Sequence, residues 1–142
     1  REIVTPAVAA RQAGFEICLK PLIGTARDEE TLLQRKEIAR QRLAFYFSTP
    51  AYARAFNLYG LEELCADLAS ASKRQAWDQM AAMIDDNLLD EFVVVARYDE
   101  LAKTIEQRYA GLIDRIEVSI PIVDEADKES LGQIVKDINA IT

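Results

Sequence analysis

Two strand-like segments, residues 15–23 and 113–120, lie on either side of a long stretch with helical periodicity. The first is rich in strand formers, carries Pro21 near its end and is bounded by glycines; the second alternates aliphatic with polar residues. A short β-branched run at 92–96 adds one extended segment. Strands alternating with helices indicate a parallel sheet. Two good strands cannot close a sheet, so we expect a helix-rich α/β chain that forms part of a larger sheet.

The remaining segments have helical patterns. An acidic first turn at residues 28–30 favours a helix start there, and Pro50 ends that helix. Trp77 and Leu88 mark the ends of one later apolar stripe, and Asp99 is expected to cap the helix that Gly111 closes. The predicted helices cover residues 3–12, 28–47, 50–58, 61–69, 77–88, 99–110 and 127–140.

Composition narrows the class of protein. The chain has 142 residues and a mass of 16.0 kDa, half of the residues are hydrophobic and 29% are charged, which is typical of one globular domain. Its uncharged apolar runs are far shorter than the roughly 20 residues of a membrane span, so we expect no membrane partner. The net charge of −7 argues against nucleic-acid binding, which usually requires a basic surface.

The absence of histidine excludes a Ser-His-Asp or Cys-His catalytic group and any His-ligated metal. Cys18 and Cys65 lack CxxC spacing and lie in apolar segments, which favours buried, reduced thiols over a disulfide. With no secretory signal pattern, we expect a cytoplasmic protein. With neither histidine nor CxxC spacing, we expect no metal site. The chain begins with Arg1 in what resembles the middle of a helix, so we expect it to be a piece of a longer protein.

One motif carries a family resemblance. Residues 43–52, Leu-Ala-Phe-Tyr-Phe-Ser-Thr-Pro-Ala-Tyr, resemble the "IAFYgSTPaY" segment of luciferase-like monooxygenases. That family comprises flavin- or deazaflavin (F420)-dependent oxidoreductases of the bacterial luciferase superfamily. The similarity continues, in order and spacing, over most of residues 14–120, through residues 77–80, 85–95, 99–101 and 108–116.

The resemblance implies the C-terminal portion of a (β/α)8 TIM barrel, its last two strands, with a large helical insertion. Residues 1–142 would form one partial domain, because such barrels need about 250 residues. Its parts would be strand seven with its loop at 14–25 (the strand itself 15–23), helices and insertion at 28–91 (the insertion itself 50–91), and at 92–142 an extended segment, a helix, strand eight (113–120) and the last outer helix (127–140).

The chain departs from the family pattern at two places. Ala96 and the Arg97-Tyr98 pair stand where members commonly have Gly after the valine run and Pro before the acidic helix start. Phe47 replaces the usual Gly of the motif, which puts a bulky side chain at a permissive backbone position. The first departure leaves the turn before the helix at Asp99 undefined.

Candidate site residues follow from the barrel, in which chemistry sits at the carboxyl ends of the strands. Gly24 and Thr25 are candidates for cofactor binding, through close backbone approach and a hydroxyl; alternatively, Gly24 makes the turn and Thr25 assists the helix start. A second set is a candidate substrate pocket, although aromatic residues at helical spacing are more often core. That set is Phe47, Ser48, Ile120 and Pro121.

Other polar residues are expected to have structural rather than functional roles. Arg115 is expected to pair locally with Asp114 or Glu117. The acidic pairs at 85–86, 90–91 and 124–125 are expected to be helix caps and solvated surface, because adjacent helical residues point about 100° apart. No catalytic residue is identified.

The resemblance therefore implies an oxidoreductase or monooxygenase that uses F420, or alternatively FMN, for hydride transfer or oxygenation of a small organic substrate. The cofactor would be bound mainly by parts of the barrel outside this chain, which alone would be inactive. The alternative is a non-enzymatic α/β or helical oligomerisation module. In either case we expect a homo-oligomer, or the remainder of the barrel, to cover the exposed strand edges. Segments 15–23 and 113–120 lying parallel and adjacent would favour the barrel.

Overall fold

The computed structural model describes residues 4–11 and 13–141 and shows a helix-rich α/β arrangement. Its elements, in chain order, are α1 (Val4–Ala9), β1 (Cys18–Leu19), β2 (Leu22–Ala26), α2 (Glu29–Phe47), the 3-10 helix η1 (Pro50–Tyr52), α3 (Ala53–Asn57), α4 (Glu62–Lys73), α5 (Trp77–Ala82), α6 (Asp86–Phe92), β3 (Val93–Arg97), α7 (Tyr98–Tyr109), β4 (Arg115–Ile116) and α8 (Glu125–Asn139).

The strands form two short parallel pairs. β1 runs beside β4 in the register that sets Cys18 opposite Arg115. β2 runs beside β3 over five residues, with Gly24 opposite Val95. Since β1 and β2 belong to one extended segment, the two pairs bring together three distant parts of the chain. The sequence-based expectation that segments 15–23 and 113–120 lie parallel and adjacent is met at β1 and β4.

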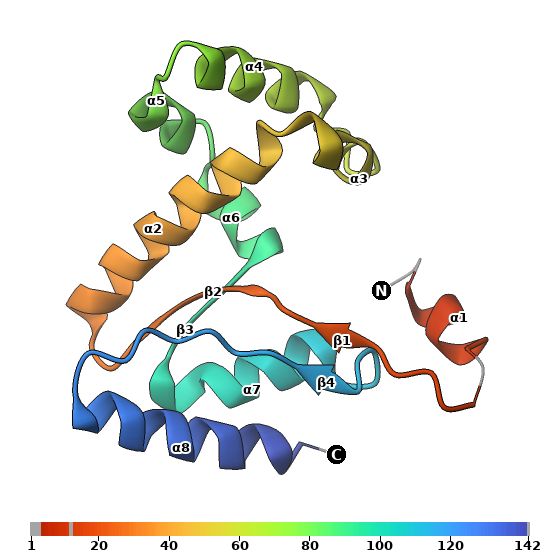
Figure 1. Ribbon diagram of the computed structural model, residues 1–142, viewed down its shortest axis with the longest axis vertical. Coiled ribbons are helices and arrows are strands. Elements are labelled where there is room, and N and C mark those ends of the chain that lie inside the picture. The colour runs from red at the N-terminus through yellow and green to blue at the C-terminus, as the bar shows by residue number, and fades with distance from the viewer. Residues whose placement is uncertain (1–3, 12, 142) are drawn as a thin grey trace.

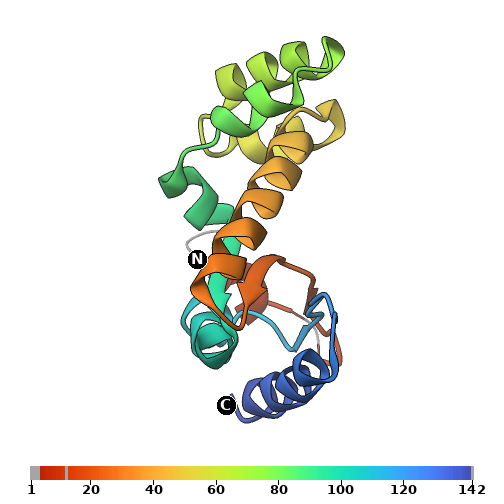
Figure 2. The ribbon, with the colours of Figure 1, turned by 90° about the vertical axis from the view of Figure 1, so that its left-hand side faces the viewer.

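The β2–β3 pair lies between two hydrophobic cores. The first core packs against α2, α4, α5 and α6, and its fully buried side chains include Phe47, Leu68, Met80, Ile84, Leu89 and Val93. The second core packs against α7 and α8 and contains Val94, Ala96, Leu101, Ile105 and Ile134. Successive residues of β3 enter different cores, as the two-residue period of a strand requires. Figures 1 and 2 show α2 running from the strands at one end of the molecule to α4 and α5 at the other.

Three helices begin at aspartate caps that the sequence places just before them. The Asp28 side chain accepts a hydrogen bond from the backbone N–H of Thr31 at the start of α2. Asp85 and Asp124 do the same for α6 and α8. Each cap satisfies a backbone donor that the first turn leaves without a partner and is worth about 1 kcal/mol.

The predicted strand at 15–23 is wrong in its extent. Pro21 has no backbone N–H, and the ladder is interrupted at Lys20 and Pro21, which divides the segment into β1 and β2. β2 then continues through Ala26, because β3 provides a partner as far as Arg97. The predicted strand at 113–120 is likewise reduced to β4, although its burial still alternates as predicted through Ile120.

Two helix predictions need correction. The single apolar stripe expected over 77–88 is divided into α5 and α6, because Asp85 caps a new helix. Trp77, assigned to the stripe, is about half exposed. Asp99 does not cap α7: the helix begins at Tyr98 directly after β3, and Arg97 is its N-cap without a side-chain hydrogen bond. Asp99 instead lies in the first turn, where a negative charge is favourable.

The predicted first helix, 3–12, is observed as α1, which ends earlier than predicted, at Ala9; residues 3 and 12 lie outside the described part of the chain. Arg11, after α1, pairs with Asp114 ahead of β4 at 2.5 Å. The helix predicted over 50–58 is divided into η1 and α3, the one predicted over 61–69 continues to Lys73 as α4, and α8 begins two residues earlier than expected. Within residues 4–11 and 13–141, no helix combines the length and apolar character that crossing a bilayer requires.

Candidate functional site

The carboxyl ends of β2 and β3 bring Arg27 and Tyr98 together. Arg27 follows the last residue of β2 and Tyr98 the last residue of β3, and those last residues are paired in register. The chain that follows β4 reaches the same place, where α8 begins with Asp124 as its cap. In parallel α/β folds this edge is where binding and catalytic groups gather, so it is the candidate site.

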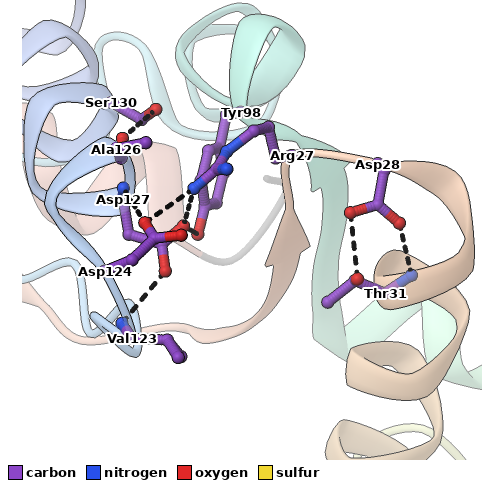
Figure 3. Close-up of polar contacts among 9 residues, drawn as sticks. All are labelled: Arg27, Asp28, Thr31, Tyr98, Val123, Asp124, Ala126, Asp127 and Ser130. Atoms are coloured by element: carbon purple, nitrogen blue, oxygen red, sulfur yellow. Dashed lines mark hydrogen bonds and ion pairs between the residues drawn. The ribbon is translucent and has the colours of Figure 1, made fainter.

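Asp127, in the first turn of α8, is the centre of the polar contacts at this edge (Figure 3). Its Oδ1 atom lies 2.7 Å from Nη2 of Arg27 and accepts a hydrogen bond from the Tyr98 hydroxyl at 3.2 Å. Its Oδ2 atom accepts from the backbone N–H of Val123 at 3.0 Å. The same Arg27 nitrogen lies 2.9 Å from Asp124 Oδ1. Asp127 is buried, with 8% of its surface exposed.

These contacts set the charges at the edge. The N–H of Val123 and the Arg27 guanidinium hold the pKa of Asp127 below its ordinary value, so it is ionised at neutral pH. Burial, and then the charge of Asp127, raise the pKa of Tyr98, which therefore remains a hydrogen-bond donor. The charge of Arg27 is compensated by two carboxylates. The cluster joins the N-terminus of α8 to the ends of β2 and β3, and its groups are engaged with one another.

Gly24 and Thr25, the residues predicted to hold a cofactor, lie next to each other in β2. Both lie within β2 and are buried, rather than in a turn after it, which also excludes the alternative roles in turn and helix start. A Cβ added at Gly24 would lie 3.2 Å from the Arg35 carbonyl oxygen, so this glycine permits α2 to pack closely on the strand. The Thr25 hydroxyl donates to the Ala96 carbonyl at 2.5 Å. In the structure both residues therefore contribute to the packing of β2 against its neighbours.

The four residues of the predicted substrate pocket are not brought together. Phe47 is fully buried in the first core, with ring centroids 4.0 Å from Phe56 and 5.1 Å from Phe92. Ser48, also buried, donates to the Phe45 carbonyl. Ile120 packs on the second core, whereas Phe47 belongs to the first, and Pro121 is exposed in the segment between β4 and α8.

Sequence reasoning missed Arg40, the one arginine of α2 that is buried. It pairs with Glu37 at 2.8 Å on its own helix, and its guanidinium also reaches the Ile84 carbonyl and Asp86. Asp86 is also bound by Lys36 at 3.0 Å. The helical position of Arg40, one residue after the core residue Ala39, was the signal available.

The expected roles of the acidic pairs agree with the caps at Asp85 and Asp124. In the described ranges, no group of three or more metal-ligating side chains gathers in one place. Arg115 does not pair with Asp114 or Glu117, contrary to what was expected. Because β1 lies beside β4, the Nε atom of Arg115 lies 2.9 Å from a carboxylate oxygen of Glu16. Cys65 is buried as expected and burial raises its pKa, but Cys18 is exposed, contrary to expectation.

Comparisons with known proteins identify relatives of greater length. An uncharacterized protein of Mycobacterium tuberculosis strain H37Rv and one of Mycobacterium bovis are each 31% identical to this chain over 126 residues. Each match covers 89% of this chain, which spans only 36% of the relative's length. No protein-family model matches the chain, and no solved structure matches it.

Proposed function

We propose that this chain is the C-terminal part of a luciferase-like oxidoreductase that uses F420, or alternatively FMN, to reduce or oxygenate a small organic substrate. In that enzyme the chain acts as scaffold and as one wall of the site. The reaction class comes from the resemblance of residues 43–52 and the segments that follow. The observation that supports the proposal best is the parallel, adjacent placement of β1 and β4, which is what the proposal expects of strands seven and eight of a barrel.

The size of the relatives supports the same proposal. This chain spans 36% of their length, which leaves room for the strands that would complete a barrel. The engaged groups at the carboxyl edge are consistent with a scaffold role, since Arg27, Tyr98 and Asp127 bind one another. When bound, the cofactor would supply the hydride or oxygen chemistry. The residues of this chain would hold the edge of the sheet in place and exclude water from it.

Titration with F420 and with FMN tests this function. The longest natural polypeptide that contains this chain is expected to bind one of these cofactors and to catalyse turnover in its presence. The 142-residue chain alone is expected to bind neither. The proposal fails if the longer product binds neither cofactor, or if the 142-residue chain turns over by itself.

A non-enzymatic interaction module is the second candidate, and exposed apolar side chains favour it. Phe15, Ile122 and Val123 are more than half exposed and lie in the segments flanking β1 and following β4. Such groups are usually covered by a partner chain. Sedimentation equilibrium tests this candidate. The module is favoured if the chain forms a dimer that Val123→Ser dissociates and the control Leu58→Ser does not, and if the longer natural polypeptide binds no cofactor.

A further inference from the structure

A crevice of about 590 Å³ opens between α7 and α8, with the β4 segment as its floor. Its apolar lining comes from three elements: Ile105 and Tyr109 of α7, Ile116 and Val118 of the β4 segment, and Leu131 and Val135 of α8. Ile105 is buried and Val135 is 45% exposed, while the other four are half-buried, so the side chains do not fill the space between the helices. The volume is within the range of small-molecule sites in proteins, about 300–1,000 Å³.

The Tyr109 hydroxyl is a hydrogen-bond donor that lines the crevice and has no internal partner among the described residues. Tyr109 is half-buried, and its hydroxyl makes no hydrogen bond with any described residue. Since no described side-chain oxygen is both buried and without a partner, this hydroxyl is accessible from the crevice. The hydroxyl therefore remains open to a ligand. Burial raises the pKa of Tyr109, which keeps the phenol protonated and able to donate.

The charges around the crevice select against ions. Asp114 is paired with Arg11 and Arg115 with Glu16, so both are compensated. Glu106, exposed at the rim, has no side-chain ion pair with any described residue, which leaves the rim negative. An anion would be repelled there, and a cation would lose its hydration against aliphatic walls.

We propose that this crevice binds a neutral, mainly apolar small molecule that carries a hydrogen-bond acceptor for the Tyr109 hydroxyl. The proposal goes beyond the function proposed above, because it uses no residue of the carboxyl edge and holds whether or not the protein uses F420 or FMN. Volume, lining and charge each contribute: the apolar walls supply the affinity, Tyr109 orients the ligand, and Glu106 excludes anions.

Three matched probes test the proposal on the 142-residue chain: acetophenone, ethylbenzene and benzoate. They share an aromatic ring and differ in whether they carry a neutral acceptor, no acceptor or a charge. Methyl NMR shifts of Ile116, Val118, Leu131 and Val135 report occupancy of the crevice. We expect acetophenone to bind most tightly and benzoate at least tenfold more weakly. Equal binding of benzoate and acetophenone, or shifts from none of the probes, would overturn the proposal.

Variants separate the hydroxyl from the walls. Tyr109→Phe is expected to weaken acetophenone binding about fivefold, the value of one hydrogen bond, and to leave ethylbenzene unchanged. Val135→Trp, at a half-exposed position, is expected to fill the crevice and abolish binding of both. Leu33→Trp, at a similarly exposed position on α2, is the control that keeps binding. If Tyr109→Phe changes neither probe, or if dilution shows that a second copy of the chain occupies the crevice, the proposal is wrong.

Discussion

Gly24 of β2 lies directly against the backbone of Arg35 in α2: a Cβ at position 24 would stand 3.2 Å from the Arg35 carbonyl oxygen. Contacts this close to backbone atoms cannot be relieved by turning a side chain, so the helix itself would have to move. The approach of α2 to the strands therefore depends on a glycine at this position.

Gly24→Ala is expected to lower the free energy of unfolding by about 1–3 kcal/mol, because the added methyl displaces α2 from β2. Urea denaturation followed by circular dichroism measures the change. Gly132→Ala in α8 is the matched control: beyond the adjoining backbone of its own helix, nothing lies within 4 Å of the added Cβ, and the same substitution should stabilise the helix by about 1 kcal/mol. Equal effects of the two variants would show that close packing at Gly24 is unimportant.

Arg40 joins α2 to the Ile84 carbonyl in the segment before α6 and to Asp86, the first residue of α6. Arg40→Met keeps most of the apolar stem but leaves the Ile84 carbonyl without this donor, and we expect a loss of about 1–3 kcal/mol in thermal or urea unfolding. The exposed Arg42→Met on the same helix should change stability by less than about 0.5 kcal/mol. A fully stable Arg40→Met protein would mean that the cost of burying the charge cancels its bonds.

Asp127 makes stability depend on pH at the acid end. Its pKa is lower in the folded protein than in the unfolded chain, so its contribution is complete above the ordinary carboxyl pKa of about 4 and is lost as pH falls through the folded value. Asp127→Asn is thus expected to lower the free energy of unfolding at pH 7 and to differ less from the natural protein near pH 3. Urea titrations at pH 7, 5 and 3 measure this, with the exposed Glu129→Gln as control. A difference that stays constant over that range contradicts the role given to Asp127.

Thr25→Val removes the buried hydroxyl that donates to the Ala96 carbonyl while keeping the shape of the side chain. We expect a stability loss of about 1 kcal/mol and no change in the affinity of the longer product for F420 or FMN. Thermal unfolding and cofactor titration give the two values. Weaker binding of F420 or FMN with unchanged stability would support the cofactor-binding role that the sequence predicts for Thr25.

Sequence patterns identified the elements whose causes are local. The start of α2 follows from Asp28 and the acidic turn after it, and the end of α7 from Gly111, whose φ of 75° favours glycine. The parallel adjacency of 15–23 and 113–120 was expected from the family resemblance, which makes these segments the last two strands of a barrel. Pro21 marked the place where the ladder is interrupted, although the prediction used it only as a tolerated end.

The parts that were missed depend on contacts between distant segments. Gly24 was assigned to a turn because no local pattern shows that α2 returns to pack on it. The partner of Arg115 is Glu16, which β1 brings beside β4. Similarly, the cluster around Asp127 needs three strand or helix ends to meet. Neither Arg27 nor Tyr98 has a neighbour in sequence that would indicate this contact.

The mass of the natural protein that carries this chain decides whether it functions as part of a larger barrel. Immunoprecipitation from the source cells, followed by intact mass spectrometry, gives that value. We predict a polypeptide at least about twice the 16.0 kDa of this chain, as the 36% coverage of its relatives suggests. A natural polypeptide of 16 kDa would contradict the proposal that the chain is part of a barrel, and would leave the interaction module as the function.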